Sequence, residues 1–145
     1  MTVAAERGSG DVGHLEWSEE FSVDIISIDK DHQDLFRLFN VLVDTCESGG
    51  RFEEIVEAYQ ALAAHTQAHF QREEQLMQNI DLPGLEAHIT QHRRLLKEAG
   101  EVANDLSPDS TASDLKAVLA YLRLWVVRHI MLSDKEILQH LHRQR

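Results

Sequence analysis

Apolar residues recur every three or four positions along four stretches of this chain, a spacing typical of amphipathic α-helices. The first predicted helix begins near Asp29–Asp31, where either aspartate could cap it, and runs to about Ser48. The second and third cover about residues 51–79 and 85–105, and the fourth runs from possible caps at 110–114 to about residue 134. Short turns join them. The pattern therefore predicts an all-α, up-down-up-down four-helix bundle.

The ends of the chain do not follow this helical pattern. Residues 1–13 are rich in glycine, alanine, serine and charge, and they predict a flexible tail. Residues 14–28 predict an extended arm over the core, with Trp17 and Phe21 as its anchors. Residues 135–145 predict a short terminal helix or a frayed end. The length suits one domain, which we place at residues 14–145.

Turn chemistry supports the helix boundaries. The pair Gly49-Gly50 can end the first helix. The turn at residues 81–84 contains Pro83, which suits the first turn of the helix that follows.

Six polar residues occupy places where the apolar stripes of the helices call for core residues. Such groups are costly to bury without partners, by several kcal/mol in aggregate. At a rise of about 1.5 Å per residue, all six reach one level of the bundle, near the turn between the second and third helices. Imidazole and carboxylate groups gathered at one level predict a metal site. The six residues are His32, His69, Glu73, His88, His92 and His129.

Asp134 is a conditional seventh member of this group. It follows His129 by five residues, which places it about 140° away around a regular α-helix. It can join the site only if the helix ends, kinks or contains a wide turn at this point.

Composition excludes several functions. The net charge of −11 argues against nucleic acid and anionic membranes as partners. The single Cys46 cannot form an internal disulfide, which favours a reducing compartment, and we expect a cytoplasmic protein. No secretory signal or membrane-spanning apolar run is expected. Nine histidines in 145 residues are the compositional anomaly.

Together, these motifs resemble those of the hemerythrin family, specifically its single-domain bacterial members, over roughly residues 15–135. Two departures from the family pattern stand out: Asp24 occupies a place where the family often has glycine, and His65 adds a histidine one turn before His69. The matching pieces are Trp17 with Phe21, Ile28-Asp29-x-x-His32-x-x-Leu35-Phe36, His69-Phe70-x-x-Glu73-Glu74-x-x-Met77, His88-x-x-x-His92, and Trp125-x-x-x-His129-Ile130-x-x-x-Asp134-Lys135.

The resemblance implies a non-haem di-iron centre: two Fe(II)/Fe(III) ions with an oxo or hydroxo bridge. It assigns His88, His92 and His129 to one iron, and His32 and His69 to the other. Glu73 and Asp134 would bridge the two. The iron with two histidines then has five ligands and one open position, which suits a small diatomic molecule. Apolar neighbours would form the ligand pocket and exclude water: Leu35, Phe36, Phe70, Leu122, Trp125 and Val126.

The function expected from this resemblance is reversible dioxygen binding, for storage, delivery or sensing, by a metalloprotein that is not an enzyme beyond a weak peroxidase-type activity. The alternative is a di-iron enzyme, either peroxidase-like or catalase-like or one that handles nitric oxide, so NO and peroxide are alternative ligands. A zinc buffer or sensor is disfavoured because seven ligands exceed one tetrahedral zinc. The sequence identifies no protein partner. The remaining histidines are predicted not to be ligands: His14, His65, His140 and His142.

Overall fold

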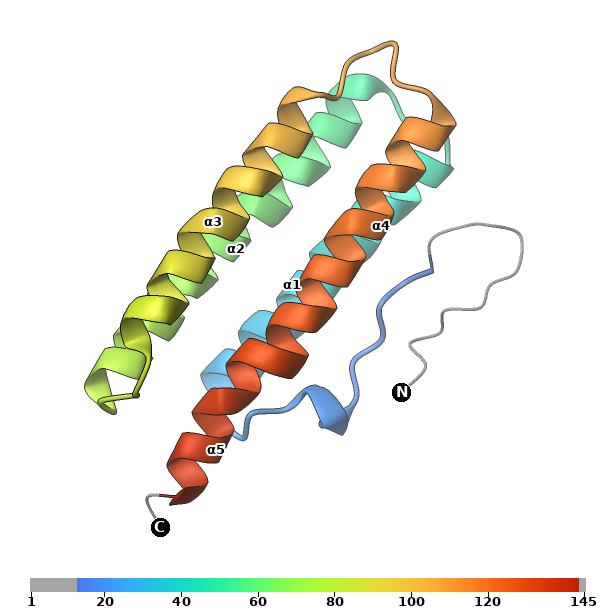
Figure 1. The fold of residues 1–145 in the computed structure, drawn as a ribbon. Coiled ribbons are helices and arrows are strands. Elements are labelled where there is room, and N and C mark those ends of the chain that lie inside the picture. Colours follow the sequence, from blue (N-terminus) through green and yellow to red (C-terminus); the bar gives the residue numbers. More distant parts are fainter. Residues whose placement is uncertain (1–12, 144–145) are drawn as a thin grey trace.

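Four long helices form the body of the protein in this computed structural model, which describes residues 13–143. Helix α2 packs beside α1 and α3, and α4 packs against α1 (Figure 1). A π-helix, His129–Asp134, joins α4 to the short helix α5, Lys135–Arg143, which continues the line of α4. Within the described residues there is no strand, and the four-helix bundle prediction is confirmed. The long helices are α1 (Ile26–Glu47), α2 (Phe52–Asn79), α3 (Leu85–Asn104) and α4 (Ala112–Arg128).

Helix α1 begins three residues before the predicted cap, so the capping role of Asp29 or Asp31 is wrong. Ile25 is the N-cap, and it makes no side-chain capping bond. The carboxylate of Asp29 instead reaches back to the arm, where it accepts hydrogen bonds from the Ser22 hydroxyl at 2.5 Å and the Val23 amide at 2.9 Å. An aspartate in the first turn of a helix can satisfy donors that precede the helix, and here those donors belong to the arm.

The other helix starts follow local sequence signals more closely. Thr111 and Asp114 form a reciprocal capping box at the start of α4, as the caps expected at 110–114 predicted. Gly84, with a φ of 85°, is the N-cap of α3. Glycine adopts this left-handed conformation without strain. Because the helix begins only after Gly84, Pro83 precedes it instead of lying in its first turn.

The arm packs along the bundle as predicted. A 3-10 turn, Glu19–Phe21, buries Phe21 against Phe36 with ring centroids 5.0 Å apart, and Trp17 contacts both rings. The Asn40 side chain bonds the backbone amide and carbonyl of Leu15 at 2.8 and 2.9 Å. The predicted tail at 1–13 lies outside the described residues, except for residue 13.

Asp24 adopts a φ of 58°, in the left-handed region that glycine tolerates best. This is the position where the resemblance leads one to expect glycine. Asp24 therefore adopts a φ that is less favourable for aspartate than it would be for glycine.

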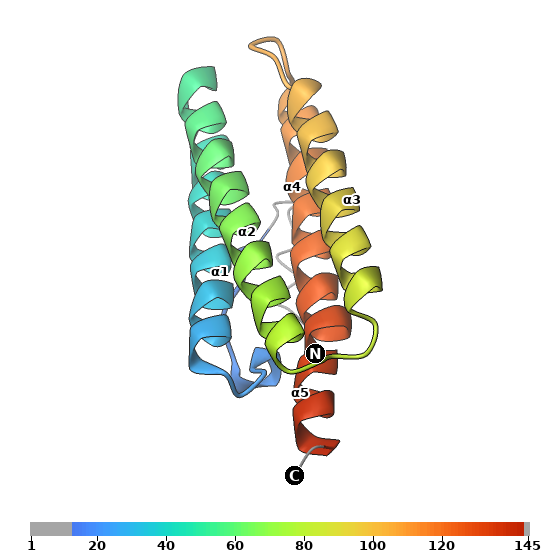
Figure 2. The same ribbon diagram turned by 90° about the vertical axis from the view of Figure 1, so that its left-hand side faces the viewer.

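Two apolar clusters flank the level at which the polar residues meet. The larger cluster includes Phe39 of α1 and Leu62 of α2, and the smaller one includes Met77 of α2 and Ile137 of α5. The intervening part of α2 carries His69 and Glu73. Figure 2 shows the four helices running side by side around this interior, with α5 extending beyond it.

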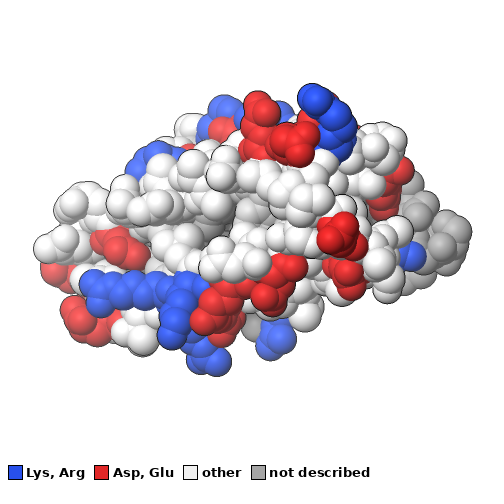
Figure 3. All heavy atoms as spheres, turned by 90° about the horizontal axis from the view of Figure 1, so that it is seen from above, with Lys and Arg blue, Asp and Glu red and all other residues white. Residues whose placement is uncertain are grey.

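Side chains of both charge signs are interspersed over the face seen in Figure 3. Across residues 13–143, none of the helices combines the length and the apolar character needed to cross a bilayer.

Candidate metal centre

Six of the seven predicted ligands converge in the interior of the bundle. They form two groups, and within each group one ligand atom per residue lies within 4.8 Å of all the others. The six side chains come from α1, α2, α3 and the π-helix, and each residue is at most 4% exposed. The first group contains His32, His69, Glu73 and Asp134, and the second contains Glu73, His92, His129 and Asp134.

Both carboxylates belong to both groups, and each directs one oxygen toward each group. Glu73 Oε2 lies 2.9 Å from His69 Nε2, whereas Glu73 Oε1 lies 3.2 Å from His92 Nε2. Asp134 Oδ2 lies 2.8 Å from His32 Nε2, whereas Asp134 Oδ1 lies 3.0 Å from His129 Nε2. This is the arrangement by which two carboxylates could bridge two metal ions.

These short distances lack the directed geometry of hydrogen bonds. Among the described residues, both oxygens of Glu73 and of Asp134 are buried without a hydrogen-bond partner, as are the Nε2 atoms of His92 and His129. Buried polar groups normally have partners, and unpaired carboxylates are especially costly to bury. Cations placed between imidazole and carboxylate would satisfy them all, and a donor set of nitrogen and oxygen suits iron. The residues therefore fit a di-iron group.

The electrostatics of the site also favour cations. Burial by itself would raise the pKa of Glu73, but the surrounding histidines hold that pKa well below its usual range. Burial opposes a charged His69, yet its close approach to Asp134, Asp31 and Glu73 raises its pKa to about 11. Against the same burial, Asp134 and Glu73 raise the pKa of His129 to about 10. Without a metal, imidazolium protons therefore balance the carboxylates, and an incoming metal ion would displace them.

The π-helix supplies the wide turn that Asp134 requires. Residues five apart return to nearly the same face in a π-helix, because its hydrogen bonds span five residues instead of four. Asp134 consequently faces the same interior as His129, and both are buried. Single π-helical turns within helices often occur at functional sites.

His88 is the predicted ligand that the structure leaves beside the two groups. It is buried, and its ring lies 6.4 Å from that of His92. Its Nε2 atom faces Glu136 of α5, with 3.8 Å to Oε1, and its Nδ1 atom is buried without a hydrogen-bond partner. His88 remains a predicted ligand, which would have to turn its ring toward His92 and His129.

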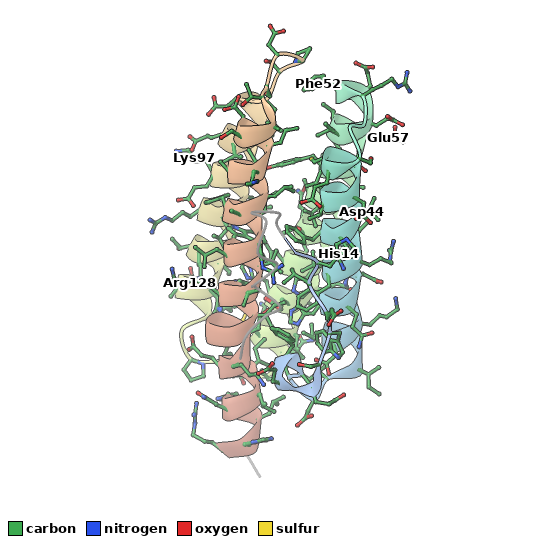
Figure 4. All side chains as sticks on the ribbon, turned by 90° about the vertical axis from the view of Figure 1, so that its right-hand side faces the viewer. His14, Asp44, Phe52, Glu57, Lys97 and Arg128 are labelled. Carbon is green, nitrogen blue, oxygen red and sulfur yellow. The ribbon has the colours of Figure 1, made fainter. Side chains whose placement is uncertain are left out.

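The four histidines predicted not to be ligands lie outside both groups. His14 Nε2 lies 2.7 Å from Asp44, and Figure 4 shows the two side chains close together. His65 and His140 each contact a backbone carbonyl, of Asp31 and Ile80 respectively. His142 lies 3.9 Å from Asp24. His140 differs from its predicted place in a loose end, because α5 buries it against the end of α2.

Sequence analysis missed two carboxylates that contact the outward-facing nitrogen atoms of two histidines, and an arginine that binds one of these carboxylates. Asp31 contacts the Nδ1 atom of His69 and also binds Arg72, while Glu74 lies 2.6 Å from the Nδ1 atom of His92. Asp31 and Glu74 are each adjacent in sequence to a predicted ligand, and Arg72 immediately precedes Glu73. That adjacency was the available signal, although a charged neighbour on a helix is more often exposed.

Aromatic packing encloses the second group. The ring of Phe70 stacks on His92 with centroids 3.8 Å apart and planes 1° apart, and it lies 5.0 Å from the ring of His129. Trp125 is partly buried and lies 6.3 Å from the His129 ring. The other predicted pocket residues are buried in the larger apolar cluster: Leu35, Phe36, Leu122 and Val126.

The fold and the site together define a class of protein. It is a four-helix bundle with a candidate two-metal site, in which two groups of histidines share two buried carboxylates. The family model described as "Hemerythrin HHE cation binding domain" matches residues 24–141. The chain belongs to the hemerythrin family.

The chain is also similar to individual hemerythrins and bacteriohemerythrins over most of their length. The chain is 30% identical to the bacteriohemerythrin of Methylococcus capsulatus over 125 residues, covering 83% of this chain and 92% of that protein. It is 27% identical to the bacteriohemerythrin of Ralstonia nicotianae over 121 residues, covering 83% and 84%. A crystal structure of a hemerythrin variant with leucine replaced by alanine aligns with a TM-score of 0.76 at 26% identity, covering 88% of this chain and 96% of that chain.

Proposed function

We propose that this protein binds dioxygen reversibly at a di-iron centre, for storage, delivery or sensing. The observation that carries the proposal is the pair of ligand groups that share Glu73 and Asp134. Two ferrous ions in such a site would supply the two electrons that dioxygen binding requires. The proposed ligands are His32, His69, Glu73, His88, His92, His129 and Asp134.

The histidines divide unequally in this proposal. His32 and His69 would hold one ion, whereas His92, His129 and the adjacent His88 would hold the other. With both carboxylates and one small bridge shared, an ion held by His32 and His69 would keep one open position. A single open position supports binding of one small diatomic ligand.

The protein's own contribution to reversibility is the exclusion of water and protons. Beside the ion with the proposed open position, Leu35, which is 2% exposed, lies one turn after His32 on α1, and the Phe70 ring centroid lies 5.9 Å from that of His69. Apolar walls of this kind keep a bound small molecule from proton donors that would promote its release in a reduced form. Five histidines, neutral once they bind metal, and two carboxylates also leave few groups that could deliver a proton.

We further place the protein in the cytoplasm. Cys46 is its one cysteine, and burial raises the pKa of its thiol to about 11. Such a thiol is a poor nucleophile at neutral pH and does not depend on an oxidising compartment.

The test is a cycle of dioxygen addition and removal. The iron-loaded protein is reduced without air and exposed to dioxygen, and the visible ligand-to-iron absorption band is followed while dioxygen is purged. Recovery of the reduced form over several cycles, with little hydrogen peroxide released, is the expected result. Oxidation in one direction on first contact, together with rapid turnover of added hydrogen peroxide, would overturn the proposal in favour of a peroxidase-like or catalase-like enzyme.

A further inference from the structure

Asp31 stands behind His69, on the side of the ring that faces away from the metal groups. Its Oδ2 atom accepts hydrogen bonds from His69 Nδ1 at 3.1 Å and from Arg72 Nε at 2.8 Å. Its Oδ1 atom accepts a second bond from Arg72 Nη2 at 2.8 Å. The Asp31 side chain is only 10% exposed, so this contact between α1 and α2 is shielded from water.

The fork of two hydrogen bonds from Arg72 fixes the plane of the Asp31 carboxylate. Bidentate arginine–carboxylate pairs add geometric specificity to their charge attraction, which a lysine could not reproduce. The Asp31 backbone is also tied to α2, because His65 Nε2 lies 3.1 Å from its carbonyl oxygen. The acceptor that meets His69 is therefore held from two directions.

The second metal group has a related contact with a different charge balance. Glu74 Oε2 lies 2.6 Å from His92 Nδ1, and the Glu74 side chain is 28% exposed. Within the described part of the chain, no lysine or arginine contact accompanies this carboxylate. One histidine in each group thus has a carboxylate behind it, and only the one behind His69 is neutralised by an arginine.

A carboxylate behind a metal-binding histidine has two effects. It holds the ring proton on Nδ1, which leaves the Nε2 lone pair for the metal, and it makes the imidazole a stronger donor. An arginine bound to the same carboxylate withdraws part of that negative charge and so weakens the second effect.

We propose that Asp31 is a positioning residue for the group formed by His32 and His69, and that Arg72 moderates the donor strength that Asp31 gives to His69. The redox part of this inference rests on the proposed di-iron function. It assigns to the Asp31–Arg72 pair the tuning of the metal ion that has the open position.

The two halves of the pair should shift the midpoint potential in opposite directions. Asp31→Asn removes the negative acceptor, weakens donation by His69 and should raise the potential. Arg72→Met leaves the Asp31 charge uncompensated, strengthens donation and should lower it. A tenfold change in the ratio of ferric to ferrous affinity corresponds to about 59 mV for one electron. Asp44→Asn is the matched control, since Asp44 lies further along α1, is exposed and pairs with His14.

A second readout avoids iron and dioxygen altogether. Metal-free protein is titrated with zinc(II) against a chelator of known affinity. Loss of Asp31 should weaken the binding of one of two zinc ions by about 10- to 100-fold, whereas Asp44→Asn should leave the binding of both unchanged. Because the Arg72 side chain is 49% exposed, Arg72→Met should fold normally even if Asp31→Asn does not.

Potentials that move in the same direction in both variants, or do not move, would overturn the tuning role of the pair. Unchanged zinc affinity in Asp31→Asn would overturn the positioning role. A wild-type protein that binds two zinc ions with the expected loss in Asp31→Asn, yet fails to bind dioxygen reversibly, would contradict the proposed function alone.

Discussion

Replacing Phe70 with alanine should remove both packing energy and protection of the metal site. The ring is 2% exposed and stacks on His92 at a centroid distance of 3.8 Å. A buried phenylalanine replaced by alanine costs about 3–5 kcal/mol in the free energy of unfolding. Since native domains are stable by about 5–15 kcal/mol, the iron-loaded variant should still fold.

The location of the new cavity determines the second effect. A cavity lined by apolar side chains stays dry, but one with several polar groups in its wall can hold water. The space left by Phe70 would border the rings of His69, His92 and His129. Water should therefore enter, and the reduced protein should oxidise irreversibly in air several times faster than wild type.

Phe39→Ala is the matched control for this prediction. Phe39 is fully buried in the apolar cluster, two turns from His32 along α1, so its cavity should stay dry. Urea unfolding of both iron-loaded variants should show similar losses of stability, while stopped-flow absorbance should show faster oxidation for Phe70→Ala alone. Equal oxidation rates in the two variants would refute the reasoning, because oxidation would then follow stability and not water exclusion.

Three further outcomes follow from the arm, the extra histidine and the charges of the site. Asp24→Gly should raise the free energy of unfolding by about 0.5–1 kcal/mol, because it relieves a left-handed aspartate; a lower urea midpoint would contradict this. His65→Ala should retain two irons by elemental analysis and lose about 0.5–1.5 kcal/mol of stability with its bond to the Asp31 carbonyl; a fall to one iron would show that His65 supports the centre directly. Zinc affinity of the metal-free protein should rise with pH between about 6 and 9, because His69 and His129, with pKa values of about 11 and 10, hold protons that the metal must displace; affinity independent of pH in a chelator titration would contradict this.

The bundle and the convergence of its polar residues could be predicted because both depend on helical periodicity. His32, His69 and His92 interrupt apolar stripes, and counting along the helices placed them at one level. Helical periodicity could make Asp134 only a conditional ligand. Whether a helix widens into a π-turn depends on the hydrogen-bond register that packing selects, and residue spacing does not reveal it.

The errors at α1 have a different cause. Asp31 is a plausible helix cap by residue type, but a cap competes with every other donor that the folded chain brings near. The fork of Arg72, from a helix about 40 residues away in sequence, supplies stronger partners than a local amide. His88 likewise has a remote neighbour, Glu136, whose Oε1 atom lies 3.8 Å from its Nε2 atom and which only the path of α5 places beside it.

Metal stoichiometry tests the two-ion reading of this site most directly. Protein produced with iron available, then freed of loosely bound metal, is measured by elemental analysis against its amino-acid content. Because Glu73 and Asp134 belong to both ligand groups, the account predicts close to two iron ions per chain. A value near one, or a predominance of zinc, would contradict it.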